Sequence, residues 1–382
     1  MNIKRKIIYL AGFLFSVPLA LTSYINSSYL KEYISEYSVG ILYTVASILA
    51  ILFLFKMPKI LTRHGNKKFI IVSGIVTLIS LALIALSENI YVIVPAFVIF
   101  FISSDLILAS LDIFVEDFST NQSIGRFRGI YLTFVNLAWV ISQMISGSII
   151  KKSSFAGIYL FSSLFIILMI LVFVFLLKKF KDPEYKRVSL LKTFKHIARN
   201  SKLHKIYTIF FILKFFFAWM IIYTPIYLHE EIGFGWDQIG TIFSIMLLPF
   251  VILTFPIGKL SDKIGEKKML ILGFVICSLF TLMIPFIGIK AVWIFALILF
   301  MTRVGAALIE AMSEIYFFRI VSEADADVIA FFKNTYPLSF VVAPLVATIL
   351  LLFLPHFSYL YPILSVILLL GLMLSLRLKD VK

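Results

Sequence analysis

The side chains best suited to chemistry in this sequence are acidic and basic groups spaced along two long apolar runs. Both sets follow steps of seven and four residues: Asp105, Asp112 and Glu116 in and just after the run at 90–115, and Arg303, Glu310 and Glu314 in the run at 291–317. Residues at those steps stay on one face of a helix, so each run carries one polar stripe. Carboxylates bind and release protons, whereas arginine binds anions or pairs with carboxylates. The stripes therefore predict a site for protons or for a charged solute.

Depth within the runs separates these groups further. At about 1.5 Å per residue, Asp105 lies about 20 Å from the start of its helix, near the middle of a ~30 Å membrane core. Arg303 lies at a similar depth in its own run, and Lys214, in the run at 206–228, lies at a depth comparable to Asp112 and Glu310. Ionisable groups at such depths cost about 2.5–3.5 kcal/mol and normally face a cavity or a partner.

Other polar and aromatic residues are weaker candidates for the lining of a cavity. Asn136, Gln143 and Gly147 again follow steps of seven and four, with Trp139 beside them, and the run at 206–228 carries Trp219 and Tyr223. The amide stripe can bind solute hydroxyls or amides, or it can hydrogen-bond one helix to another. The aromatic pair can form a platform for a solute or simply pack. Four further charges, expected near the membrane edge, are interpreted as interfacial latches: Glu116, Glu314, Arg319 and Lys333.

Helices in a membrane must position these groups. Of the 382 residues, 61% are apolar and only 14% are charged, which is more apolar than a soluble domain can bury. Apolar segments about 20 residues long lie at 7–27, 38–58, 69–87, 90–115, 128–150, 156–177, 206–228, 238–257, 269–288, 291–317, 329–354 and 358–376. Only helices or closed barrels satisfy the backbone in hydrocarbon, and these segments are too long and too apolar for barrel strands. The prediction is an all-α membrane protein of twelve helices, the first a retained helix rather than a cleaved signal.

The longest polar stretch divides the helices into six and six. Residues 178–205 carry ten Lys/Arg against two acidic residues, so we expect bundles at 1–177 and 206–382 joined by a basic linker at 178–205. The other cations gather at both ends of the chain and in the segments on the linker's side of the membrane. By the positive-inside rule, both termini and the linker face the cytoplasm. Topology thus accounts for the net charge of +15 without a nucleic-acid partner.

A repeat at an offset of 200 residues relates the two halves. The segment "PKILTRHGNKK" at 58–68 returns as "GKLSDKIGEKK" at 258–268, and Gly40 returns as Gly240. The polar stripes repeat at an offset of 198. Two six-helix halves in the same orientation, related by an axis along the membrane normal, form a known transporter architecture.

The later segment resembles the signature loop of the major facilitator superfamily of transporters, of bacterial type. It matches the pattern Gly-x-Leu-Ala/Ser-Asp-Arg/Lys-x-Gly-x-Arg/Lys-Arg/Lys at Gly258, Leu260, Ser261, Asp262, Lys263, Gly265, Lys267 and Lys268. In that family the loop's Asp helps to latch the cytoplasmic side, which gives weight to Asp262. The first copy has Pro58 and Thr62 in place of Gly and Asp. The Gly-Pro-x-x-Gly-Gly motif usual in proton-driven drug exporters is absent from 128–150, which weakens an exporter reading.

The resemblance implies two pseudo-symmetric bundles and secondary active transport of a small solute by alternating access, in the rocker-switch manner. Asp105 and Arg303 would oppose each other across the halves, as a proton or substrate site or as a structural pair. Lys214 would contact Glu310 or Asp112, as a gate, a coupling site or a structural pair. The expected partners are the lipid bilayer, a small-molecule substrate and protons, for a monomer in the plasma membrane. No cofactor, metal or nucleic acid is expected.

Other functions remain open at this point. An uncoupled facilitator, a lipid scramblase or a transporter-like receptor would share the architecture without gradient-driven accumulation. A membrane-embedded lipid-modifying enzyme would need clustered His or acidic motifs on one loop, and the five His are scattered.

Overall fold

The fold is described by a computed structural model over residues 3–118, 124–177, 200–321, 328, 331–332 and 334–378, and every regular element in these ranges is a helix. Nine helices there are long and apolar enough to cross a membrane, and two shorter apolar helices cover Trp236–Ile252 and Thr335–Leu351. One of the nine, the span Ile130–Leu176, contains two membrane-length arms. The prediction of twelve membrane helices in an all-α chain is confirmed.

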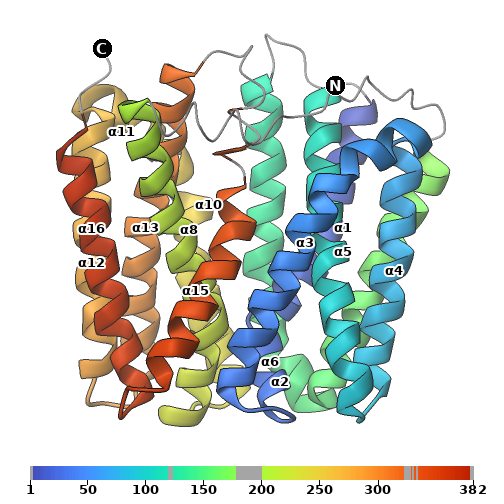
Figure 1. Cartoon of the computed structure of the whole chain (residues 1–382), viewed down its shortest axis with the longest axis horizontal. Coiled ribbons are helices and arrows are strands. Elements are labelled where there is room, and N and C mark those ends of the chain that lie inside the picture. Colours follow the sequence, from blue (N-terminus) through green and yellow to red (C-terminus); the bar gives the residue numbers. More distant parts are fainter. Residues whose placement is uncertain are drawn as a thin grey trace. The chain divides into compact units, whose positions relative to one another are not determined.

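The chain forms two compact units, residues 1–187 with 235–240 and residues 188–234 with 241–382. The predicted linker lies outside the described residues from 178 to 199. The first unit contains α1 (Ile3–Ser23), α2 (Asn26–Lys31), α3 (Glu36–His64), α4 (Asn66–Leu86), α5 (Ile90–Asp117), α6 (Ile124–Leu171) and the π-helical turn η1 (Val172–Leu176). Within this unit α4 and α5 run side by side (Figure 1).

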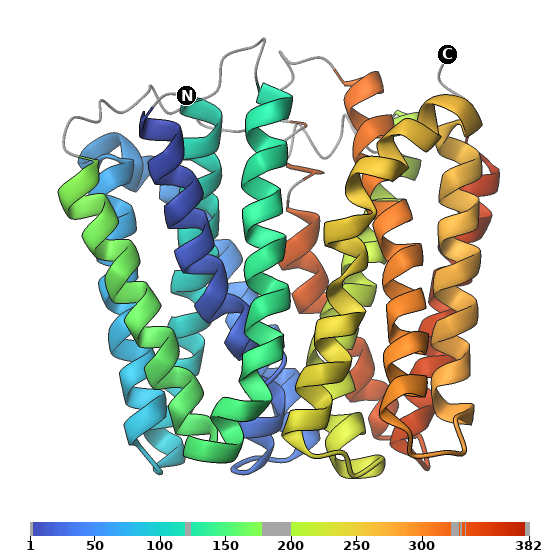
Figure 2. The ribbon, with the colours of Figure 1, turned by 180° about the vertical axis from the view of Figure 1, so that it is seen from behind.

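A single residue folds α6 back on itself. Ser154 has φ 58° and ψ −169°, outside the helical region, and joins two arms that correspond to the predicted segments at 128–150 and 156–177. Figure 2 shows the two arms as the teal and green helices joined by a tight turn. This connection positions the Asn136 and Gln143 stripe on the first arm, which packs against α1.

The second unit is built from a longer list of elements. These are α8 (Ser201–Ile226), η2 (Tyr227–Glu231), α9 (Trp236–Leu247, its first residues counted with the first unit), α10 (Pro249–Ile252), α11 (Thr254–Ile264), α12 (Glu266–Met283), η3 (Ile284–Phe286), α13 (Val292–Ile320), α15 (Thr335–Leu351), η4 (Phe357–Tyr359) and α16 (Leu360–Leu376).

Several helix boundaries differ from the sequence prediction, and two of the differences have a visible cause. The single helix expected at 238–257 is broken at Leu248 and at Leu253 into α9, α10 and α11. Pro249 follows the first break, where its missing N–H and its ring interrupt the helical hydrogen-bond ladder. The helix expected from residue 206 begins at Ser201, because the Asn200 side chain caps it by accepting from the N–H groups of Lys202 and Leu203.

The repeated charged segment is a meeting of two helix ends rather than a loop. α3 runs through His64 and α4 starts at Asn66, so Gly65 alone makes the turn; Gly265 does the same between α11 and α12. Their torsions are nearly equal, φ 76° and ψ 156° for Gly65 and φ 88° and ψ 149° for Gly265. A side chain disfavours this positive-φ region. The glycine at the same place in each half is therefore required by backbone geometry.

Small residues set the packing of the helices that carry the second stripe. At Gly305 of α13, an added Cβ would lie 2.6 Å from the backbone oxygen of Gly273 and 2.6 Å from the backbone nitrogen of Cys277, both on α12. Close approach of this kind is typical of membrane helix pairs with glycine at the crossing. It fixes the position of α13, and with it Arg303 and Glu310.

Candidate functional site

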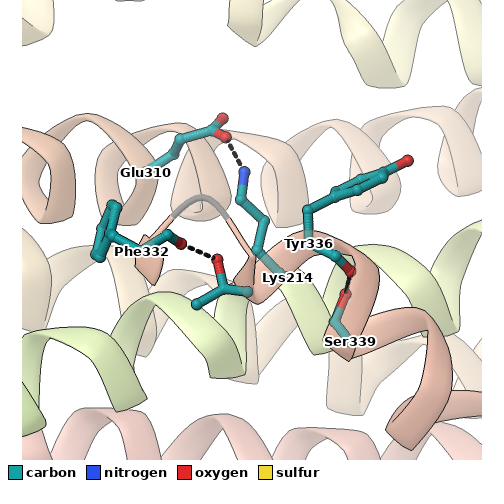
Figure 3. Close-up of polar contacts among 6 residues, drawn as sticks. Lys214, Glu310, Phe332, Tyr336 and Ser339 are labelled. Carbon is teal, nitrogen blue, oxygen red and sulfur yellow. Dashed lines mark hydrogen bonds and ion pairs between the residues drawn. The ribbon is translucent and has the colours of Figure 1, made fainter. Parts of the chain in front are cut away.

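The centre of the candidate site in the second unit is an ion pair between Lys214 of α8 and Glu310 of α13. The Lys214 ammonium donates to Oε1 of Glu310 (Figure 3). The two side chains are 13% and 29% exposed, so both charges are largely removed from solvent. The sequence predicted that Lys214 would contact either Glu310 or Asp112. Glu310 is the one of these two that belongs to the same unit as Lys214.

Aromatic rings surround the Lys214 ammonium. Its nitrogen lies 4.5 Å from the ring centroid of Phe210 and 5.2 Å from that of Phe217, one turn to either side on α8. The Phe210 ring stacks at 4.3 Å on Phe332, which stacks at 3.9 Å on Phe317 of α13. Cation–π attraction grows when the cation is desolvated, so these rings hold the ammonium in place beside Glu310.

A second cation shares one of these rings. The guanidinium of Arg303, seven residues before Glu310 on α13, lies 5.5 Å from the Phe217 ring centroid and 5.0 Å from that of Phe216. Arg303 is 1% exposed and is among the largest fully buried side chains of the described chain. The site thus combines two cations and one carboxylate within an aromatic enclosure, with a formal charge of +1 when Glu310 is ionised.

Helix α15 packs against α8 in the same unit. Oγ1 of Thr335 donates to the backbone oxygen of Phe332 at 2.7 Å, and Oγ of Ser339 donates to the backbone oxygen of Tyr336 at 2.7 Å (Figure 3). Toward the C-terminal end of α8, the Tyr223 hydroxyl donates to the backbone oxygen of Pro344 at 3.2 Å. Trp219 is fully buried between the rings of Phe215 and Tyr223, at 5.4 and 5.8 Å. The Tyr223 hydrogen bond ties α8 to α15, whereas these ring contacts of Trp219 lie within α8.

The first unit holds Asp105 at mid-helix in α5. Its Oδ2 is buried, and no hydrogen-bond donor reaches that atom among the described residues. The neighbouring Ser103 hydroxyl receives a hydrogen bond from the Thr77 hydroxyl of α4 at 2.8 Å. Asp112, two turns further along α5, is half-buried. An acidic oxygen in this setting is costly as a bare charge, so Asp105 is a candidate for proton binding.

The amide stripe of α6 is engaged between helices. Nε2 of Gln143 donates to the backbone oxygen of Ala20 in α1 at 2.6 Å, and Gln143 is 1% exposed. The Trp139 ring meets the Tyr24 ring edge-on at 6.2 Å. Asn136 is half-buried. In this structure Gln143 therefore connects α6 to α1.

The residues predicted at the membrane edge are described only in part. Arg319 of α13 pairs through Nη1 with Oε1 of Glu266 at 2.6 Å. Lys263 and Lys268 are exposed, Lys267 and Glu314 are half-buried. Lys333 lies outside the described residues, and so do the side-chain surroundings of Glu116, Gly258 and Asp262.

Sequence reasoning missed the phenylalanines and Glu266. Phe210 and Phe217 precede and follow Lys214 by four and three residues, which is the helical spacing that places rings next to a lysine. Glu266 is an acidic residue at the first position of α12, within an otherwise basic segment, and it is 4% exposed. A lone buried acid among cations is a signal for an ion pair. No group of three or more His, Cys, Asp or Glu that could hold a metal ion occurs in the searched, described part of the chain.

Comparison with known proteins decides the family. The sequence model of the Major Facilitator Superfamily matches residues 8–240 and 225–382, which together cover nearly the whole chain. The chain belongs to the major facilitator superfamily. Its architecture is the twelve-helix fold of that family, and it is an integral multi-pass membrane protein.

Individual relatives are distant. The chain is 24% identical over 254 residues to Multidrug resistance protein 2 of Bacillus subtilis (strain 168), an alignment that spans 62% of this chain and 62% of that protein. The crystal structure of a POT family transporter in complex with thioalcohol conjugated peptide is 13% identical, with a TM-score of 0.78, over 98% of this chain and 95% of that one. A POT family transporter in complex with 5-aminolevulinic acid gives the same values. At this identity the solved structures establish the fold alone.

Proposed function

We propose that this superfamily member is a proton-coupled secondary transporter that moves a small solute bearing an anionic group by alternating access. The single observation that carries this proposal is the largely buried Lys214–Glu310 ion pair, set beside Arg303 and Phe217. The distribution of cations along the sequence supports a plasma-membrane topology with both termini and the 178–205 linker in the cytoplasm.

Protonation of Glu310 is the coupling step in this mechanism. A proton taken up by the carboxylate neutralises it and leaves the Lys214 ammonium without its charge partner. The ammonium, together with Arg303, then favours an anionic group of the solute in the same place. When proton and solute leave on the other side, the carboxylate is restored and pairs with Lys214 again. Proton and solute therefore move together, in the direction that their gradients set.

Asp105 supplies a second proton-binding group in the first unit. The absence of a donor for its buried Oδ2 in the described structure favours a carboxyl group that is neutral for part of the cycle. Asp105 and Arg303 belong to different units, and we propose that they face a common cavity, as the equal offsets of the two stripes suggest. Rocking of the two halves would expose that cavity to each side in turn.

Proteoliposomes with trapped pyranine and an imposed pH gradient test the proposal. Three probes cover the candidate solute classes: 5-aminolevulinic acid, a dipeptide and the amphipathic cation ethidium. We expect one of the first two to drive proton movement that Glu310→Gln abolishes, whereas Glu36→Gln, which removes the carboxylate of the Lys31–Glu36 pair at 3.0 Å, leaves it unchanged. Solute entry that stops at equal concentrations on the two sides and moves no protons would support an uncoupled facilitator instead.

The second candidate function is transport of an amphipathic cation, for which ethidium is the probe. The stacked Phe210, Phe332 and Phe317 rings make the surroundings of Lys214 strongly apolar, and the relative from Bacillus subtilis is a multidrug resistance protein. Proton movement with ethidium alone would favour an amphipathic substrate and would contradict the role given to Lys214 and Arg303 as anion-binding cations, because both would repel a cation.

A further inference from the structure

A lateral groove in the first unit lies outside the proposed transport site. Its cavity, about 510 Å³, is bounded by one face each of α3, α4 and α5, including Phe53 of α3, Val72 and Val76 of α4, and Ile99 of α5. That volume lies within the range of roughly 300–1,000 Å³ typical of ligand sites. Phe53, Val72 and Ile99 are 45%, 52% and 44% exposed. An apolar cavity with exposed walls on a membrane helix opens toward lipid.

The groove has the depth of a single leaflet. Lys68, Val72 and Val76 follow one another at four-residue steps down one face of α4. At about 1.5 Å per residue, Val76 lies about 12 Å below Lys68, less than half of a ~30 Å hydrocarbon core. A buried apolar cluster of Met57, Leu61, Phe69 and Leu106 packs beneath, so the floor of the groove is preformed.

A lysine and a histidine mark the shallow end of the groove. Lys68 and His64 belong to its lining and are exposed, and within the described structure neither side chain is engaged in a hydrogen bond or an ion pair. Arg63 and Lys67 stand next to them in the sequence. The deep end is closed by apolar residues and the Ser73 and Ser103 hydroxyl region. A ligand that fits has an apolar tail and an anionic head.

The corresponding place in the second unit has the charge but is packed differently. At the offset of 200 residues, Lys268 is equivalent to Lys68, Ile264 to His64 and Gly273 to Ser73. An added Cβ at Gly273 would lie 2.9 Å from the backbone oxygen of Gly305 and 2.8 Å from the Ile309 side chain, so α12 lies directly on α13 there. Lys268 is therefore an exposed lysine at the position equivalent to Lys68, on a helix that packs closely on α13 at Gly273.

We propose that the groove of α3, α4 and α5 binds an anionic phospholipid, with one acyl chain along Val72 and Val76 and the headgroup phosphate at Lys68 and His64. Charge complementarity selects this occupant, because a cationic amphiphile would meet the same side chains unfavourably and a zwitterionic lipid would gain less. The lipid comes from the leaflet at the cation-rich ends of α3 and α4.

Photolabelling tests the site without any need for transport, so its outcome is separate from that of the proposed function. The full-length protein is reconstituted in phosphatidylcholine bilayers that contain a small fraction of phosphatidylglycerol with a diazirine in its acyl chain. After irradiation, mass spectrometry locates the labelled residues. We expect labels on the groove walls, at Phe53, Val72 or Ile99, and little label when the diazirine is carried by phosphatidylcholine.

Three variants sharpen the result. Lys68→Gln should lower the groove labelling about fivefold, the effect of removing one cation near an anionic headgroup. Lys268→Gln should leave it unchanged, and Val72→Trp should lower it by filling the groove while the charge at Lys68 remains. Equal labelling by the two lipids, or an equal loss in Lys68→Gln and Lys268→Gln, would overturn the proposal. So would full labelling in Val72→Trp.

Discussion

Lys214 and Glu310 form an ion pair between α8 and α13, and the Phe217 ring beside that pair also contacts the Arg303 guanidinium. Two cations therefore share one aromatic ring next to one carboxylate. The formal charge of the group changes from +1 to +2 when Glu310 takes up a proton. The higher positive charge would attract an anion, as the proposed coupling of proton and solute requires.

The strength of this pair is measurable by a double-mutant cycle. Lys214→Ala leaves a largely buried carboxylate without its partner, and Glu310→Ala leaves a largely buried ammonium. The losses of unfolding free energy in the two single variants should therefore add up to more than the loss in the double variant. We expect a coupling free energy of about 1–2 kcal/mol, between the values typical of exposed and of fully buried pairs. Unfolding in mixed micelles gives the four free energies. Additive single changes would mean that the contact does not stabilise the fold.

The turn glycine of the repeated segment provides a test of backbone geometry. At Gly265 an added Cβ would meet nothing within 4 Å, yet φ is 88°. Gly265→Ala should therefore lower the free energy of unfolding by about 1–3 kcal/mol through backbone strain alone. Gly288 is the matched control: it also has open space around a Cβ but no positive φ. A loss in Gly288→Ala as large as that in Gly265→Ala would show that strain is not the cause.

Helix packing at α12 and α13 makes a separate prediction. Gly305→Ala would place a methyl group against the backbone of Gly273 and Cys277, which cannot move without separating the helices, so we expect a loss of about 1–3 kcal/mol. Gly74→Ala is less severe. Its nearest neighbours are the Ile170 and Met169 side chains, at 2.9 and 3.2 Å, and they can change rotamer.

Thermal unfolding in detergent should rank the two variants in that order. The reverse order would show that the contact between α12 and α13 is more adaptable than the backbone distances indicate.

Long apolar runs were sufficient to predict the number and approximate position of the helices, since a membrane span has to be about 20 residues of continuous apolar helix. The offset of 200 residues also pointed to the glycines at the two turns. Glycine is needed there because the backbone of each turn has a positive φ. The breaks at Leu248 and Leu253 and the extension of α11 through Ile264 were not predicted. These boundaries depend on capping and on packing within the unit, which apolar composition does not record.

For the candidate site, helical spacing identified the charged residues but not all their neighbours. Lys214 had two possible carboxylate partners, and only the crossing of α8 and α13 brings it to Glu310. The same crossing brings Phe217 between two cations. Gln143 shows the opposite case, because its polar stripe suggested a solute contact or an interhelical bond, and the structure has it bonded to α1.

The most direct test of proton coupling separates solute exchange from proton-driven accumulation in one variant. Proteoliposomes with wild-type protein and with Glu310→Gln are compared in two assays with a transported solute. In the first, unlabelled solute is present on both sides and the exchange of labelled solute is measured. In the second, a pH gradient alone drives the accumulation of solute. A neutral amide mimics protonated Glu310, so Glu310→Gln should retain exchange at near wild-type rate and lose pH-driven accumulation. Undiminished pH-driven accumulation in Glu310→Gln would contradict the assignment of Glu310 as the coupling residue.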